Sequence, residues 1–183
     1  MTAYLLLVLA VLSRFLPLAG GQFHHDWMNF TAVGAVLLYF GARRSWREMV
    51  APLAVLAATD YAMTTMVYHY SFNVAWYVPT WIWYIAAMAL GKILLEAKTS
   101  AVRVGAASLL GPTSFFAISN YAVWVAGGMY AKTLAGLGTC YVAGLPFYRN
   151  DLISTAIVVA VAFGAPVLVR RLNGAKAAEV MAK

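Results

Sequence analysis

Charge is what this sequence has least of. Only 10% of its 183 residues are Asp, Glu, Lys or Arg, whereas a soluble domain carries about 25%. The sequence has no hydrophilic block large enough to form a separate soluble domain. It also has no glycine-rich phosphate loop followed by lysine, and no Ser/His/Asp spacing of the kind hydrolases use. These absences exclude a soluble globular protein, argue against ATP hydrolysis by the chain itself, and predict that it is not an enzyme.

Cysteine is nearly absent as well. Cys140 is the only one, which excludes an intrachain disulfide and a multi-cysteine metal site. A lone thiol can ligate a metal or act as a nucleophile, but it is more often a small buried apolar residue. The three histidines, His24, His25 and His69, come from two separate segments, and adjacent histidines chelate a metal poorly. We expect no metal site and no catalytic residue; contact of these four residues with a metal or pigment stays open, as does any cofactor.

Apolar residues are what the chain has in abundance. They make up 63% of it, and the mean hydropathy is +0.77, which predicts an integral membrane protein in contact with the lipid bilayer. The length suffices for about six spans of about 20 residues each. The net charge of +7 is carried in short basic blocks between apolar runs. Such blocks are typical of topology signals and lipid headgroup contacts, so we expect no nucleic-acid partner.

The apolar runs predict an all-α bundle of six transmembrane helices in a single domain, residues 1–183. The spans are expected at about 3–18, 27–42, 49–68, 74–95, 102–126 and 152–168. The segment 127–148 is too polar and glycine-rich to cross, and Leu134, Leu137, Tyr141 and Leu145 recur three to four residues apart. This spacing predicts a short interfacial helix between spans five and six, with Asn150 as a candidate N-cap of the sixth span.

The basic residues indicate an orientation. Ten of the 13 Lys and Arg fall on one side of the predicted bundle. They are Arg43, Arg44, Arg47, Lys92, Lys98, Arg103, Arg170, Arg171, Lys176 and Lys183. Arg14, Lys132 and Arg149 lie on or near the other side. The positive-inside rule therefore places both termini in the cytoplasm.

Two opposite charges fall at similar depth within predicted spans. Arg14 lies in the first span and Asp60 in the third. A charge in the bilayer costs several kcal/mol unless it is paired or hydrated, so we expect the two to meet in the bundle interior. This placement is consistent with two alternatives. The pair is either purely structural, or it forms the floor of a substrate pocket and could relay a proton.

A second group of residues suits a flat or ring-bearing ligand. Trp83 lies deeper in the fourth span than an aromatic belt requires, and Asn120 and Trp124 are one helical turn apart on the fifth. Aromatic walls with a few amides are typical of small-molecule pockets. Asn29 adds an amide at the polar start of the second span.

Several motifs resemble a family of small, uncharacterised bacterial integral membrane proteins over almost the whole chain. They are Ser13-Arg14-Phe15-Leu16-Pro17, Asn29-Phe30-Thr31-Ala32-Val33-Gly34-Ala35, Thr59-Asp60, Ser119-Asn120-Tyr121-x-x-Trp124, Tyr130-Ala131-Lys132-Thr133 and Tyr141-x-x-x-x-Pro146-Phe147. That family in turn resembles the substrate-binding S components of energy-coupling factor (ECF) transporters. The resemblance implies six helices, a pocket opening outward, and loops that close over it. Two features depart from it: Ala32 replaces an expected proline, and the Ala-x-x-x-Ala docking motif lies at residues 54–62 in the third span, not in the first.

We therefore expect a substrate-binding protein of the bacterial inner membrane that takes up a small organic nutrient or vitamin-like cofactor, alone or with partner membrane subunits. Its pocket would open to the extracytoplasmic side, and the segment 133–140 would form its lid. The expected ligand-binding residues are Arg14, Asn29, Asp60, Trp83, Asn120, Trp124 and Lys132. The alternative is an accessory structural subunit of a larger respiratory or photosynthetic membrane complex, whose small-residue stripes and aromatics would be contact surfaces.

Overall fold

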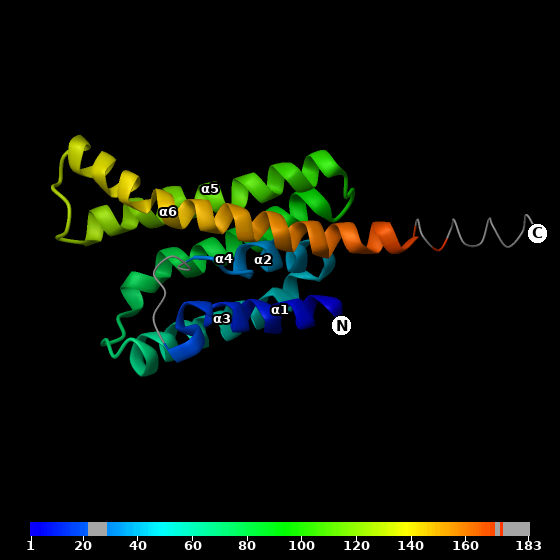
Figure 1. Cartoon of the computed structure of the whole chain (residues 1–183), viewed down its shortest axis with the longest axis horizontal. Coiled ribbons are helices and arrows are strands. Elements are labelled where there is room, and N and C mark those ends of the chain that lie inside the picture. The colour runs from blue at the N-terminus through cyan, green and yellow to red at the C-terminus, as the bar shows by residue number, and fades with distance from the viewer. Residues whose placement is uncertain (22–28, 171–172, 174–183) are drawn as a thin grey trace, which may run out of the picture.

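The described chain is built of helices stacked in three layers. A computed structural model describes residues 1–21, 29–170 and 173, and this part of the chain contains no strand. Figure 1 shows α1 (Thr2–Ser13) and α3 (Val50–Ala62) on one flank, α5 (Ala101–Ala126) and α6 (Leu134–Val159) on the other, and α2 (Val33–Arg43) and α4 (Val74–Leu95) between them. The expected count of six helices is confirmed by these elements.

Four helical stretches are long and apolar enough to cross a membrane. They are Trp46–Val67, Val74–Leu95, Ala101–Ala126 and Leu134–Arg170. The first stretch consists of a 3-10 segment at Trp46–Met49, α3 and a π-helical segment at Met63–Val67. The last stretch continues α6 through a second π-helical segment at Ala160–Gly164. Large apolar side chains on the outer faces, such as Leu5, Val102 and Ile93, are exposed. The chain is thus a multi-pass membrane protein.

Side-chain caps mark where the long helices begin. The Asn73 side chain accepts the Ala75 N–H at 3.0 Å at the start of α4, and Ser100 accepts the Arg103 N–H at 3.4 Å at the start of α5. Thr133 accepts the Gly136 N–H at 3.1 Å at the start of α6. Because each cap satisfies an N–H group that has no partner within the helix, these residues define three of the helix starts.

The start of α6 corrects the expected interfacial helix. Residues 134–148 belong to one helix that continues to Val159, so they do not form a separate surface helix or a separate lid, and Asn150 lies inside α6 and is not its N-cap. The side that α6 buries here carries Gly136, Cys140 and Gly144. Leu134 and Leu145, read as a surface-lying face, are exposed on the outside of this helix. Small residues permit close helix packing in membranes, which is why a glycine-rich segment is helical here.

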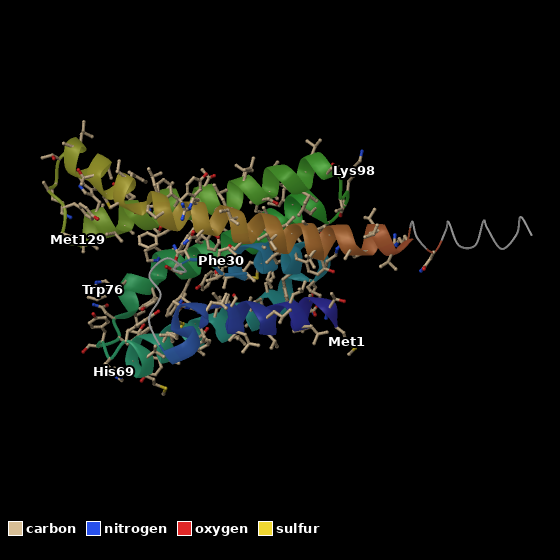
Figure 2. All side chains as sticks on the ribbon, in the orientation of Figure 1. Met1, Phe30, His69, Trp76, Lys98 and Met129 are labelled. Carbon is tan, nitrogen blue, oxygen red and sulfur yellow. The ribbon has the colours of Figure 1, made fainter. Side chains whose placement is uncertain are left out.

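The first two helices are shorter than expected. α1 ends at Ser13 and is followed by a 3-10 segment at Leu16–Gly21. α2 begins only at Val33, and the first residues of the predicted span 27–42 lie outside the described part of the chain. An 11-residue helix is about 16 Å long, roughly half the hydrocarbon thickness. Figure 2 shows Phe30 partway along the bundle, between the end with Met1 and Lys98 and the end with His69, Trp76 and Met129.

Helix α2 forms the centre of the core. Every residue from Val33 to Ala42 is buried. A Cβ at Gly41 would overlap the backbone carbonyl of Met88 in α4, and a Cβ at Gly91 in α4 would overlap that of Leu38. The two glycines therefore let α2 and α4 pack backbone to backbone.

Candidate functional site

A buried ion pair joins α1 to α3. Arg14, directly after α1, pairs through Nη2 with Oδ1 of Asp60, so the two charges expected to meet do so; their side chains are 14% and 3% exposed. The other Arg14 nitrogen, Nη1, donates to Thr59 Oγ1 at 2.8 Å and to the Leu56 carbonyl at 3.2 Å. Three acceptors from α3 thus hold the guanidinium: one carboxylate oxygen, one hydroxyl and one backbone carbonyl.

Helix α4 completes the coordination of Asp60. Trp81 Nε1 donates to Oδ2 at 2.8 Å, and the Tyr84 hydroxyl donates to Oδ1 at 3.5 Å. Both carboxylate oxygens therefore have partners, and the negative charge is balanced by Arg14. A buried carboxylate needs such pairing because the loss of hydration costs several kcal/mol.

The start of α2 is tied to the same region. Ser13 Oγ, at the end of α1, accepts the Ala32 N–H at 2.9 Å. Asn29 has a φ of 59°, a left-handed conformation that Asn adopts more readily than most residues. A Cβ at Gly34 would lie 3.3 Å from the Trp83 ring and 3.8 Å from Asp151 Oδ1. The entry into α2 thus packs directly against α4 and α6.

The Arg14–Asp60 ion pair forms part of the wall of a polar cavity of about 180 Å³. Its lining comes from the ends of α1 and α2 and from α3 to α6. The lining residues are Arg14, Asn29, Thr31, Val33, Gly34, Asp60, Thr80, Trp83, Tyr84, Phe115 and Asp151. Four of the seven expected ligand-binding residues therefore share one cavity.

A larger cavity of about 280 Å³ adjoins the first between α5 and α6. Its lining residues are Asn29, Phe115, Phe116, Ser119, Asn120, Val123, Tyr130, Cys140, Ala143, Gly144, Phe147, Tyr148 and Asp151. Asn29, Phe115 and Asp151 line both cavities, so these three side chains border the two neighbouring spaces. Their lining comes largely from the halves of α4, α5 and α6 nearest the loops with Trp76 and Met129 (Figure 2).

Aromatic rings form the walls of both cavities. Trp83 packs on Phe115 with ring centroids 4.7 Å apart, and Phe116 stacks on Tyr148, also at 4.7 Å. The Trp83 indole N–H donates to Ser114 Oγ at 3.0 Å. Because that N–H is occupied, Trp83 offers the site its ring. The walls suit a flat or ring-bearing organic molecule.

Asp151 is the functional candidate that the sequence did not single out. It is 7% exposed, lines both cavities, and accepts the Thr155 hydroxyl through Oδ1 at 3.4 Å. No Lys or Arg in the described residues pairs with it. Asp151 is an acidic residue within a long helix, which could have marked it as a candidate. The predicted interfacial helix instead placed Asp151 at the membrane surface, just before the sixth span.

Trp124 and Lys132 lie elsewhere. Lys132 Nζ donates to the carbonyls of Trp124, Val125 and Gly127, the last at 2.7 Å, and sits 5.6 Å from the Trp124 ring centroid. Trp124 Nε1 donates to the Ala131 carbonyl at 2.8 Å. The two side chains thus fasten the α5–α6 connection and line neither of the cavities described above.

The thiol and the histidines are spread over the molecule. Cys140 is buried in the wall of the larger cavity, with Sγ 3.4 Å from the Asn120 carbonyl. His69 lies in the α3–α4 loop with a φ of 56°, and His24 and His25 fall outside the described residues. Over residues 1–21, 29–170 and 173, no group of three or more His, Cys, Asp or Glu is placed to hold a metal ion.

Comparison with known proteins identifies a family. A family model described as "Family of unknown function (DUF6580)" matches residues 1–177, and the chain therefore belongs to this family. No curated protein and no solved structure matches the chain.

Proposed function

We propose that this member of the DUF6580 family is a membrane-embedded binding protein that takes up a small organic molecule. The observation that carries the proposal is the pair of adjoining cavities inside a membrane bundle. Small-molecule sites are typically apolar and aromatic with a few placed polar groups, and enclose about 300–1,000 Å³. Here Asn29, Asn120 and Asp151 supply polar groups between aromatic walls, and the two cavities together reach that range.

The charge distribution supports an extracytoplasmic pocket. Arg43, Arg44 and Arg47 lie in and after the end of α2, and Lys98 lies between α4 and α5, at the Met1 end of the bundle (Figure 2). The positive-inside rule makes this end cytoplasmic. The cavities lie toward the opposite half, which would face the periplasm in a bacterial inner membrane.

The fold suggests how the site could serve uptake. The Arg14–Asp60 pair closes the polar cavity toward α3, and the buried α2 closes it toward the Met1 end. A ligand that enters from the opposite end would rest on these groups. Release into the cytoplasm would require α2 to move, or a partner subunit of the kind that S components of ECF transporters use.

Native mass spectrometry of the full chain, extracted gently from its own membrane, tests the proposal. A small organic molecule should remain on the wild-type monomer and be lost from Asn120→Ala. Within the described part of the chain, the Asn120 amide donates to the Phe116 carbonyl of its own helix at 2.9 Å and accepts a weak contact from Cys140 Sγ at 3.9 Å, so this change should leave the fold intact. Thr139→Ala, an exposed position one residue before Cys140 in α6, is the matched control and should retain the molecule.

The opposite result would favour the alternative. Co-release of stoichiometric larger subunits, with no small molecule on the wild-type chain, would overturn the binding-protein proposal. It would favour an accessory subunit of a larger membrane complex, for which the exposed apolar helix faces would be contact surfaces.

A further inference from the structure

We propose that the ligand of this site is a small organic cation, whose charge is held by Asp151 between aromatic rings. The inference rests on the proposed function and names the substrate class of the same cavities. It follows from which charges in the lining are already balanced, which one is not, and which neutral groups surround that one.

Only three described residues that line the cavities carry a formal charge. They are Arg14, Asp60 and Asp151. Arg14 and Asp60 neutralise each other, and Trp81 and Tyr84 complete the coordination of the Asp60 carboxylate. An ionised Asp151 therefore leaves the lining with one net negative charge.

Asp151 itself has little to balance that charge. Among the described residues, its carboxylate accepts one long hydrogen bond, from Thr155. The groups that line the smaller cavity with it include the neutral Asn29 amide, Gly34 at the entry of α2, the Trp83 ring of α4 and the Phe115 ring of α5. The start of a helix supplies only a partial positive charge, while an unpaired carboxylate in a membrane protein interior costs several kcal/mol. A cationic ligand beside Asp151 would remove this cost.

The aromatic walls favour the same ligand. A cation within about 6 Å of a ring centroid is attracted to the ring face, most strongly for Trp. Trp83 and Phe115 are packed against each other beside Asp151, and the Trp83 N–H is already occupied by Ser114. An anionic ligand would instead need a free cation in the wall, and Arg14 is engaged by Asp60, Thr59 and Leu56.

Binding of three ring compounds to the purified full chain tests the inference. The probes are benzyltrimethylammonium (cation), benzyl alcohol (neutral) and benzoate (anion), titrated calorimetrically in an uncharged detergent. Wild-type protein should bind the cation at least tenfold more tightly than either of the others. Asp151→Asn keeps the side-chain size and should weaken cation binding at least tenfold while changing benzyl alcohol binding less than twofold.

Two further variants separate the site from general effects. Glu96→Gln removes one negative charge from an exposed position near the far end of α4, and should leave cation binding unchanged. Phe115→Leu removes a ring but keeps an apolar side chain, and should reduce the preference for the cation over benzyl alcohol several-fold. This variant tests the inference even if Asp151→Asn fails to fold.

Each outcome decides between the two proposals. Equal or tighter binding of benzoate, or unchanged cation binding in Asp151→Asn, would overturn the cation inference and leave the binding-protein proposal standing. The same holds if native mass spectrometry finds a neutral or anionic molecule on the wild-type chain while benzyltrimethylammonium does not bind. If neither experiment finds a bound small molecule, both proposals fail.

Discussion

Removing either member of the Arg14–Asp60 pair should destabilise the protein strongly, and removing both should cost less than the sum of the two single losses. Asp60→Asn leaves the Arg14 guanidinium buried without its counter-charge, and Arg14→Met leaves the Asp60 carboxylate with only Trp81 and Tyr84. Breaking a buried ion pair in this way costs about 3–5 kcal/mol. For a chain of this size, 1 kcal/mol shifts the melting temperature by about 2–4 °C, so each single variant should melt roughly 6–20 °C below wild type.

The double variant measures the coupling. Arg14→Met combined with Asp60→Asn leaves no buried charge, so its loss should be smaller than the sum of the two single losses by about 2 kcal/mol or more. Glu96→Gln is the control, because it breaks a surface pair whose acid is 53% exposed, and such pairs contribute about 1 kcal/mol or less.

The lone cysteine provides the assay. Cys140 is 2% exposed, so a fluorogenic thiol reagent should label it only as the bundle unfolds, and the labelling curve on heating gives the melting temperature. Single variants that melt within about 2 °C of wild type would refute the view that this pair is dehydrated and tightly coupled. Strict additivity of the two losses would refute it as well.

Four further outcomes follow from the packing and the site. Gly91→Ala should prevent folding or lower the melting temperature by more than 10 °C, because its Cβ would overlap the Leu38 carbonyl; a melt like that of wild type would contradict the close α2–α4 approach. Gly144→Ala should displace the Asn120 side chain, whose Oδ1 would lie 2.5 Å from the new Cβ, and should abolish retention of the small molecule in native mass spectrometry without a large loss of stability. Asn29→Gly keeps the left-handed backbone and should fold better than Asn29→Ala, while both variants lose ligand retention; equal melting temperatures would argue against the backbone effect. Lys132→Met should lower the melting temperature yet leave ligand retention intact, because Lys132 binds carbonyls of the α5–α6 connection outside the cavities.

The site was predictable where burial in a membrane alone imposes a partner. Arg14 and Asp60 had to meet because neither charge is tolerated alone at depth. Trp83 lies beyond the reach of an interfacial belt and is found in the cavity wall. Trp124 and Lys132 are residue types that often line ligand pockets. Here, however, backbone carbonyls at the end of α5 and in the α5–α6 connection satisfy their polar groups. Spacing along the chain does not distinguish these two situations.

Composition and hydropathy by themselves determined that this is an all-helical membrane protein, since the scarcity of charge leaves no other stable environment for so many apolar side chains. Only the tertiary structure decided that α6 begins at Leu134, because Cys140 and Gly144 become a buried face only when Asn120 of α5 lies against them. The same packing brings Asp151 beside Trp83, Phe115 and the entry of α2. These residues come from four different helices, and the distances between them depend on how closely the backbones approach, which no single segment of the sequence encodes.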